Sequence, residues 1–575
     1  MTEESRQIPR GAAAKSAGTS SRASSSGGSR AESAGLRAAP DLYLVAATPP
    51  TDIRAVVTQL EQDDSCRVVR ILRGPSGGPG VAVVEMTPEH AATLASYPGV
   101  HAEPDYPAAA ATGPATGVAA TTKHVRFEAV DDGGHPIEGA AVTLTGSGSV
   151  SVSGGLPVTG FTGADGRAEI VATPEALADA ELAEIRPPRG CWPIRVRPAK
   201  LTGTVRATCT RITTTHPDFP ERALDSWGAR AMGFERLPPT YRGRGARIAL
   251  IGSGAATGHP DLSGQIEHGR DLLGDDERSW QEDLTGKSWQ EDLTGAGTHH
   301  ATLVAGRDDG TGIAGLASEA ETHICRVTPG GSAADLIEAL DYCIEQQVDV
   351  AMFASCVAEY SALLAAKVDE AWQNGIVCIA AAGGFPAALP QVLAVGAIGQ
   401  LGTFPPEGTD TASLTGQVSP EGFFVPRFTP AGPDCCAPGV AIISGLPPAS
   451  YGPLSGTGTA AAHVTALAAL ILAHHPLFRP EPGRPRVTRD ATRPARLLEV
   501  IKASCRPLYQ SGLAHLDPAR TGLGIPDAAV ALGVAPWGAH PPLSVPYPAP
   551  PPGPDGRTSL EPLTAAMHAA GLLSP

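Results

Sequence analysis

The chain has 575 residues, a formal net charge of −16 at pH 7, and only 18% charged residues. This length exceeds what one hydrophobic core supports, so several domains are expected. The acidic balance argues against a nucleic-acid partner, which would need a face rich in Lys and Arg. No run of about 18 apolar residues is present, so we expect no membrane span.

Residues 1–40 are rich in Ser, Gly, Ala and Arg and lack the apolar segment of a secretory signal. We expect a disordered tail here, with a trimmed leader or a partner-binding arm as the alternative. Without a signal, the expected location is cytoplasmic.

Ten cysteines in so long a chain do not make a disulfide framework. Most lie in apolar stretches and are expected to be buried thiols, as are the adjacent Cys435 and Cys436. Cys191 and Cys209 flank one predicted hairpin and could pair. No Cys-x-x-Cys pair or His/Cys cluster indicates a zinc site.

In residues 41–107 the predicted strands and helices follow the order β-α-β-β-α-β, which indicates a small ferredoxin-like α+β domain. We expect Thr51 to cap the first helix and Thr87 the second, with Pro88 in the first turn of the second helix. The predicted strands cover 43–47, 67–73, 81–86 and 100–105.

A flexible Ala/Thr/Gly linker is expected over residues 108–121. Short alternating strands separated by Asp-Gly turns then predict a β-sandwich module over 122–212. A spacer role and a peptide-docking role both remain open for this module.

In residues 217–533, apolar runs of strand length alternate with segments whose apolar residues have helical spacing. This pattern predicts a doubly wound, mainly parallel sheet covered on both faces. The expected strands are 247–251, 322–327, 349–354, 376–382 and 392–398. The segment 279–286 recurs at 288–295, which indicates a duplicated surface loop. Residues 534–575 form a Pro-rich tail with one possible short helix.

Three motifs carry the strongest functional signal. They are Ile248 to Gly254 (IALIGSG), His300 to Gly306 (HATLVAG) and Ser455 to Val464 (SGTGTAAAHV). In this order they resemble the Asp, His and Ser blocks of the subtilisin-like serine peptidases, the subtilases. The resemblance places Asp at Gly252, His at Leu303 and Ser at Gly458, so the catalytic side chains are missing.

Other segments resemble the same family. Gly258 to Leu262 (GHPDL) is similar to the continuation of the Asp block, and Ala380 to Gly384 (AAAGG) is similar to a strand end that normally finishes in Asn. Gly384 therefore lacks the side-chain donor of the oxyanion site, a loss of roughly 10²–10³ in rate. The stretch 83–105 resembles the end of a subtilase propeptide.

A serine peptidase needs a hydroxyl nucleophile, an imidazole base and a carboxylate that orients the imidazole. A base displaced to His299 or His300 is disfavoured, because either residue would lie about 5 Å along the helix from position 303. His463 and the hydroxyls of Ser455, Thr457 and Thr459 fit structural roles. Cys356 is expected to be a packed thiol.

The resemblance implies a catalytically inactive subtilase that binds or scaffolds a peptide or protein. The candidate peptide groove comprises Ala354, Ser355, Cys356, Ala382 and Gly383. The expected partners are an extended segment paired to the sheet edge and the chain's own propeptide-like domain in cis. The alternatives are a peptidase with residual or relocated catalytic groups and a regulatory partner with an empty groove. No cofactor is expected, and calcium is implied by family resemblance alone.

Overall fold

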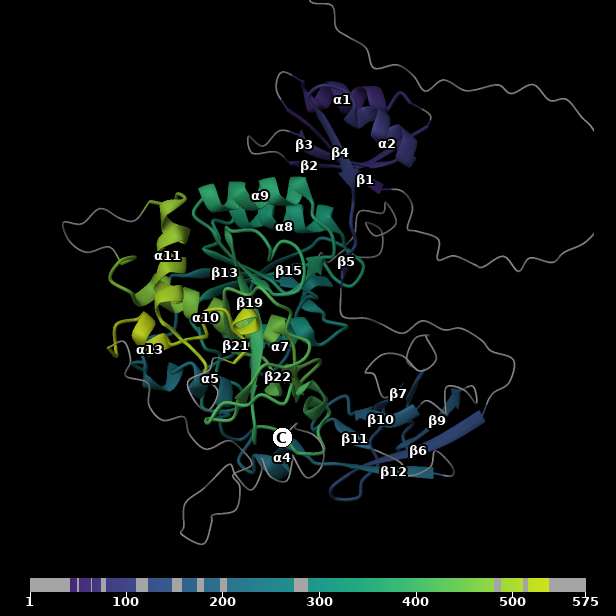
Figure 1. Cartoon of the computed structure of the whole chain (residues 1–575), viewed down its shortest axis with the longest axis vertical. Helices are drawn as coiled ribbons and strands as arrows, with labels where there is room; N and C mark the ends of the chain where they lie inside the picture. The colour runs from purple at the N-terminus through teal and green to yellow at the C-terminus, as the bar shows by residue number, and fades with distance from the viewer. Residues whose placement is uncertain are drawn as a thin grey trace, which may run out of the picture.

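The computed structural model shows three bodies joined along one chain (Figure 1). The structure describes residues 42–48, 51–63, 65–73, 79–109, 123–146, 158–172, 180–196, 204–273, 288–479, 488–509 and 516–536. The expected N-terminal tail, most of the linker, the first copy of the duplicated segment and the C-terminal tail from residue 537 lie outside these residues.

The N-terminal body is a four-stranded antiparallel sheet with two helices on one face. Its elements follow the chain as β1 (Leu42–Ala47), α1 (Ile53–Leu60), β2 (Arg67–Arg73), β3 (Pro79–Glu85), α2 (Pro88–Ala95) and β4 (Val100–Pro104). The strand order across the sheet is β2-β3-β1-β4.

Both helices of this body begin at a side-chain cap. Thr87 Oγ1 accepts from the backbone of His90 and caps α2, as predicted. The prediction for α1 is wrong, because the side chain of Asp52 accepts from Arg54 N, while Thr51 Oγ1 donates to Pro98 O at 3.3 Å. An Asp cap is at least as favourable as Thr at this position.

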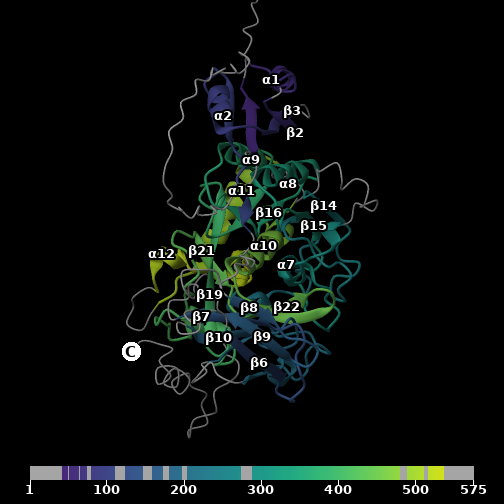
Figure 2. The same ribbon diagram turned by 90° about the vertical axis from the view of Figure 1, so that its right-hand side faces the viewer.

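The sheet is buried on both faces. Val45, Ala82 and Val84 pack beneath α1 and α2. The other face contributes Leu44 and Val83, which alternate with them along β1 and β3, to a cluster shared with the large domain. In that domain the cluster includes residues of α8 (Ala333–Glu345) and its neighbour α9 (Ala362–Gln373). Figure 2 shows this body seated on α8 and α9.

The middle body consists of β6 (Lys123–Asp131), β7 (Ala141–Gly146), β8 (Val158–Phe161), β9 (Arg167–Ala172), β10 (Ala180–Arg186), β11 (Ile194–Val196) and β12 (Thr204–Cys209). They form a four-stranded sheet, β11-β10-β7-β8, and a three-stranded sheet, β12-β6-β9. Phe127, Leu144 and Ile185 are fully buried in the apolar cluster that both sheets share.

The large domain is built on an eight-stranded sheet of order β14-β15-β13-β16-β18-β19-β20, with β21 also paired to β19. The strands are β13 (Arg247–Gly252), β14 (His268–Asp271), β15 (Glu321–Arg326), β16 (Val350–Phe353), β18 (Val377–Ala381), β19 (Val392–Gln400), β20 (Phe423–Phe424) and β21 (Cys435–Pro438). Every pairing is parallel except β19 with β20, which confirms the predicted mainly parallel α/β sheet.

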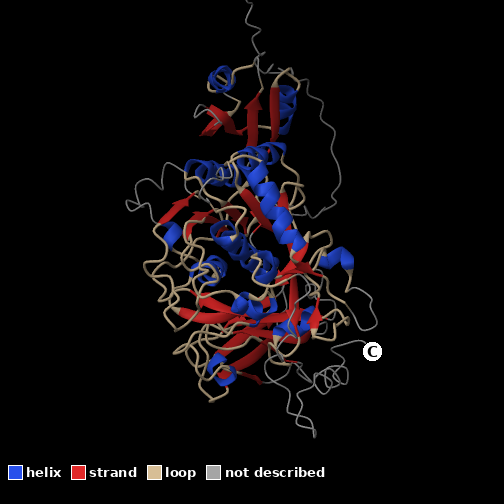
Figure 3. Cartoon of the chain, turned by 90° about the vertical axis from the view of Figure 1, so that its left-hand side faces the viewer, coloured by secondary structure: helices blue, strands red, loops and turns tan. Residues whose placement is uncertain are grey.

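Helices cover both faces of this sheet (Figure 3). The longer ones are α7 (Ala296–Ala305), α8 (Ala333–Glu345), α9 (Ala362–Gln373), α10 (Thr457–His474) and α11 (Thr492–Ala503). Short helices are α4 (Ile212–Thr215), α5 (Trp227–Ala231), α12 (Pro518–Thr521), α13 (Ala528–Ala531) and 3-10 turns at Phe234–Arg236, Ser288–Gln290 and Thr409–Ser413. Two-stranded ribbons are β5 (Ala108–Ala109) with β17 (Cys356–Val357), β22 (Ile442–Leu446) with β23 (Ser450–Leu454), and β24 (Cys505–Arg506) with β25 (Ile525–Pro526).

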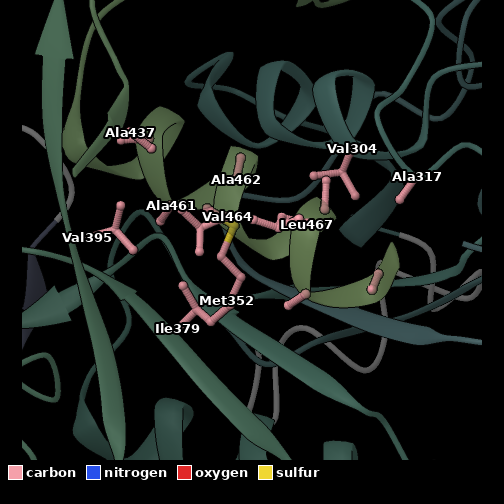
Figure 4. Packing of buried hydrophobic residues seen from close by; sticks show 14 of the residues in the cluster. Val304, Ala317, Met352, Ile379, Val395, Ala437, Ala461, Ala462, Val464 and Leu467 are labelled. Atoms are coloured by element: carbon pink, nitrogen blue, oxygen red, sulfur yellow. The ribbon is translucent and has the colours of Figure 1, made fainter. Parts of the chain in front are cut away.

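The 18-residue helix α10 forms the centre of the large domain. Its length and composition would suffice for a membrane span, but 78% of it is buried inside the protein. In Figure 4 its residues Ala461, Val464 and Leu467 pack against side chains of the sheet and of α7. Burial on all sides explains a helix without a polar face, so α10 is a core helix.

All ten cysteines are free thiols, and eight of them are buried. The possible pairing of Cys191 with Cys209 is therefore not realised. Burial raises the pKa of the Cys191 thiol to about 11 and that of Cys209 to about 12. These thiols act as small apolar side chains within the middle body.

Candidate functional site: a cluster at the carboxyl edge of the parallel sheet

The residues of the three motifs meet at the carboxyl edge of the parallel sheet, where ligand sites of such sheets form. Gly252 is the last residue of β13 and is buried. The nearest atom to a Cβ placed on Gly252 is the Cβ of Ala354, at 3.4 Å, which is an ordinary contact. There is room for a side chain at this position, but glycine supplies no carboxylate.

An imidazole faces Gly458, the position to which the sequence resemblance assigns the nucleophile. A Cβ placed on Gly458 would lie 3.0 Å from Cε1 and 3.3 Å from Nε2 of His300. Gly458 lies in the first turn of α10, and His300 lies in the middle of α7. The imidazole of His300 and the backbone of Gly458 are therefore next to each other.

This geometry corrects the prediction for Leu303. Leu303 is 3% exposed and belongs to the apolar core together with Val304 and Ala317. The residue of α7 that reaches the nucleophile position is His300, and the prediction that a leucine had replaced the imidazole is wrong. The predicted helix is present as α7, but the imidazole that faces Gly458 lies one turn before Leu303.

Burial lowers the pKa of His300 to about 4, although the negative charge of Asp292 raises it in part. The ring is therefore neutral at physiological pH. Its Nε2 lies 3.5 Å from the Oγ1 of Thr459, at the outer limit of hydrogen-bond distance. Thr459 is only 2% exposed, so its hydroxyl is not open to a substrate.

The other nearby hydroxyls have structural partners. Ser455 Oγ donates to Asp410 Oδ1 at 2.5 Å and accepts from Ala441 N at 2.7 Å. Thr457 Oγ1 donates to the carbonyl of Ala382 at 3.0 Å. Both side chains tie the loop before α10 to its surroundings, as expected from their position.

Asp292, the carboxylate whose charge acts on His300, is also engaged in the local structure. Asp292 Oδ1 accepts from Ser253 Oγ, Thr294 and Gly295, and its Oδ2 accepts from the backbone and side chain of Thr298. Asp292 thus links the end of β13 to the start of α7. With these bonds it holds the loop before α7 and does not replace the carboxylate missing at Gly252.

His299 and His463 are buried structural residues. His299 Nε2 donates to Ile442 O at 2.7 Å, and His463 Nδ1 donates to Thr459 O at 3.0 Å. Burial lowers the pKa of His299 to about 3 and that of His463 to about 4. Neither ring is the one that faces Gly458.

Gly384, to which the sequence resemblance assigns the oxyanion donor, packs against Cys356. Gly384 lies in the turn after β18, and a Cβ placed on it would lie 2.7 Å from the Cβ of Cys356 and closer still to its Sγ. Contacts this short do not occur between real side chains and force one of the two groups to move. The side chain of Cys356 therefore fills the space that a residue at 384 would occupy.

Cys356 is not placed as a substitute nucleophile. Burial raises the pKa of its thiol, which reduces the fraction of reactive thiolate. Its backbone pairs with Ala109, and its side chain points to Gly384. The predicted packed role fits this position.

Beside these residues the chain pairs with a segment of its own backbone. Strand β5 pairs antiparallel with β17, so that Ala108 faces Val357 and Ala109 faces Cys356. On the opposite side Ala108 N donates to Gly331 O at 2.7 Å, and Pro107 bridges to Ser332. The segment Pro107–Ala109 is thus an extended strand held between two walls.

The candidate groove residues divide into two groups. Cys356 pairs with the segment, whereas Ser355 is buried and contacts Thr328 through its hydroxyl at 3.2 Å. Ala354 N donates to Ile251 O, and Ala382 N donates to Val395 O, so both belong to the sheet. Gly383 has φ +128°, a conformation that favours glycine, and a Cβ on it would lie 3.7 Å from Pro430.

Sequence reasoning missed the second wall, Gly331 and Ser332. These residues lie between β15 and α8, and β15 neighbours β13 in the sheet. The carboxyl ends of neighbouring parallel strands gather at one edge. The loop after β15 could therefore have been predicted to lie beside Gly252.

Carboxylates of the N-terminal body cap two helices of the large domain. Glu103 accepts from Ser361 Oγ at 2.7 Å, from Ala362 N at 3.0 Å and from Leu363 N at 3.1 Å, at the start of α9. Asp105 Oδ1 accepts from Ala334 N at 3.0 Å, at the start of α8. Negative charges at helix N-termini are stabilising, and here they fix the segment that enters the groove.

The ion pairs of Arg70 complete this interface. Its guanidinium lies 2.5 Å from Asp335 and 3.3 Å from Glu338, both on α8. All three side chains are largely buried, with exposures of 14%, 8% and 20%. The N-terminal body is therefore attached through capped helices, an ion-pair cluster and a shared apolar face.

Residues 243–503 match the model of the subtilase family. Subtilisin E of Bacillus subtilis is 29% identical over 269 residues, which cover 44% of this chain and 62% of that protein. Subtilisin of Bacillus pumilus is 29% identical over 266 residues, covering 44% and 86%. The major intracellular serine protease of Bacillus subtilis is 30% identical over 248 residues, covering 40% and 69%. On the strength of these matches and the fold, the chain belongs to the subtilase family.

Proposed function

We propose that this chain is a pseudoprotease, a subtilase that binds and scaffolds but does not hydrolyse peptides. The observation that carries the proposal is the pair His300 and Gly458, in which a base faces a position without a hydroxyl. Gly252 lacks the carboxylate, and Gly384 lacks the oxyanion donor. Of the nucleophile, the base, the orienting carboxylate and the oxyanion donor, only the base is retained, and it cannot catalyse peptide hydrolysis alone.

The expected loss of activity is large. In subtilisin, a relative of this chain, removal of the nucleophile alone lowers turnover by about 10⁶, nearly as much as removal of the whole triad. The loss of one oxyanion donor there lowers the rate by roughly 10²–10³. A neutral His300 without a nucleophile to deprotonate supplies no compensating step.

The groove retains the property that peptide binding requires. Backbone pairing on both walls holds the segment Pro107–Ala109 without help from any catalytic group. Without a nucleophile the chain cannot cleave itself, so the N-terminal body stays covalently attached and its segment Pro107–Ala109 occupies the groove in cis. A partner in trans would be an extended segment with small side chains that competes with this strand.

A relocated active centre is the second candidate, because Thr459 Oγ1 lies 3.5 Å from His300 Nε2. The contact is long, and the threonine is buried within α10. Asp292, whose charge acts on His300, is held by Ser253, Gly295 and Thr298. This candidate predicts labelling of Thr459 and measurable turnover.

A fluorophosphonate probe together with a casein assay tests the proposal. We expect neither labelling nor turnover in the wild-type chain, and the same result for Thr459→Ala. The variant Gly252→Asp/Gly458→Ser is the matched positive control for access of the probe. Turnover by the wild-type chain that is lost in Thr459→Ala would overturn the proposal.

Binding is tested separately with a labelled peptide of the sequence Asp105 to Ala109. Ala108→Pro removes the N–H that donates to Gly331 and weakens the hold on the chain's own segment. We expect this variant to bind the peptide more tightly than the wild-type chain does. Equal and negligible binding by both would favour a groove that serves no partner in trans.

A further inference from the structure

A cluster of three metal-ligating side chains lies in the N-terminal body, outside the cleft. The ligand atoms of Asp63, Cys66 and His90 all lie within 4.8 Å of one another, and each residue is half-buried. Asp63 and Cys66 belong to the turn between α1 and β2, and His90 belongs to the first turn of α2. The cluster thus joins two elements that the sequence separates by more than 20 residues.

Ser65 orients the imidazole of His90. Its Oγ lies 2.6 Å from Asp63 Oδ1 and 3.0 Å from His90 Nδ1. Because the single hydroxyl proton is donated to the carboxylate, Oγ accepts the proton on Nδ1. The Nε2 atom then carries the lone pair and lies 3.9 Å from Asp63 Oδ2. An outer hydrogen bond of this kind is what fixes the tautomer of metal-binding histidines.

Cys66 completes the donor set. Its thiol donates to the carbonyl of Leu60 at 3.2 Å, and burial, followed by the charge of Asp63, raises its pKa to about 11. A divalent cation bound to the sulfur would stabilise the thiolate and so offset the effects of burial and of the Asp63 charge. Binding would then release the thiol proton to solvent and leave a thiolate bound to the metal.

We propose that Asp63, Cys66 and His90 form a binding site for Zn²⁺, with water as the fourth ligand. One nitrogen, one sulfur and one carboxylate oxygen suit Zn²⁺ and exclude Mg²⁺ and Ca²⁺, which prefer oxygen ligands. Ligand atoms around tetrahedral zinc are about 3.3–3.8 Å apart, given bonds of about 2.0–2.3 Å. The observed separations therefore need only a small inward rotation of the side chains.

The site would stabilise the N-terminal body from its outer side. The apolar layer next to Cys66 lies beneath α1 and α2, whereas the docking face with Leu44 and Val83 is the opposite one. The metal would therefore pin the α1–β2 turn to α2 without a direct contact to the groove. This proposal does not depend on the loss of catalysis proposed above.

Cobalt(II), added to the metal-free full-length chain, is the probe. We expect one cobalt ion per chain, with visible d–d bands of a four-coordinate site and an ultraviolet thiolate-to-cobalt band. Zinc should displace the cobalt and raise the thermal midpoint, since a ligand that binds only the folded state stabilises it.

The control variant is Cys356→Ser, at the other half-buried thiol. We expect Cys66→Ser to lose the thiolate band and His90→Asn to weaken binding at least tenfold, while Cys356→Ser behaves as the wild-type chain. Circular dichroism verifies that each variant is folded. Absence of the thiolate band in the wild-type chain, or its survival in folded Cys66→Ser, would overturn the proposal.

Discussion

The side chain of Cys356 occupies the space into which any side chain at Gly384 would project. A Cβ on Gly384 would lie 2.7 Å from the Cβ of Cys356, so the two positions exclude each other sterically. If Gly384 stands at the oxyanion position, as proposed, Cys356 occupies the space of the absent side chain. Restoring that side chain alone would create a clash.

We predict that Gly384→Asn is destabilising on its own, by about 1–3 kcal/mol, as expected for overpacking. Cys356→Gly should relieve most of this loss, whereas Cys356→Ala should relieve less because it keeps the Cβ. Urea unfolding of the single and double variants measures the coupling energy. Strict additivity of the two substitutions would contradict the proposed steric exclusion.

The cleft should regain activity when its missing groups are returned around His300. In Gly252→Asp/Gly458→Ser we expect slow self-cleavage just after the groove segment, because the segment already lies in the cleft. Adding Gly384→Asn and Cys356→Gly should raise the rate by roughly 10²–10³, the effect of one oxyanion donor.

Peptide mapping of the fragments and the time course of their appearance provide the measurement. The control is the same set with His300→Ala, which should abolish cleavage. If Leu303→His restored activity and His300→Ala left it intact, the assignment of the base position would be wrong.

Glu103 should determine how firmly the N-terminal body is attached. Glu103→Ala removes three hydrogen bonds at the start of α9, and we expect a loss of about 1–2 kcal/mol in docking, typical of a helix cap. Hydrogen exchange at α9 and β4 should report this loss. Glu85→Ala is the control, because Glu85 forms an exposed ion pair with Arg67 within the same body. An equal effect of both substitutions would indicate that capping does not hold the interface.

Stability should fall on mild acidification because of three buried histidines. The folded-state pKa values of His299, His300 and His463 are lowered by burial to about 3, about 4 and about 4, from an ordinary value of 6.5. Below pH 6.5 the unfolded chain therefore binds more protons than the folded one. Stability is fully present above pH 6.5 and is lost as the pH falls through these values, by up to about 1.4 kcal/mol per pH unit for each ring.

Urea unfolding at pH 7, 6 and 5 tests this slope. His463→Gln should make it shallower, since one fewer proton is taken up on unfolding. A slope that is unchanged in this variant would show that other groups govern the acid sensitivity.

The sequence was sufficient to predict the sheet of the large domain and its helices to within a few residues. Buried strands such as β13 and β19 are continuous apolar runs, and α8 and α9 have clear helical spacing. The same motifs located Gly252, Gly384 and Gly458 at the cleft. Leu303 was misassigned because two histidines precede it and the motif alone did not show which turn of α7 faces α10.

The contacts between distant segments could not be predicted. The pairing of Ala109 with Cys356 and the capping of α9 by Glu103 join residues more than 240 positions apart. The cluster of Asp63, Cys66 and His90 was also not predicted, because no sequence pattern shows that α2 packs against the α1–β2 turn. Such contacts follow from how the domains pack, and that packing leaves no periodic signal in the sequence.

The intact mass of the purified full-length chain tests most directly whether this subtilase fold lacks peptidase activity. After prolonged incubation at neutral pH we predict a single species of 58.6 kDa, with the N-terminal body still joined to the large domain. A break shortly after Ala109 that develops in pure protein and is blocked by a serine-directed inhibitor would contradict it.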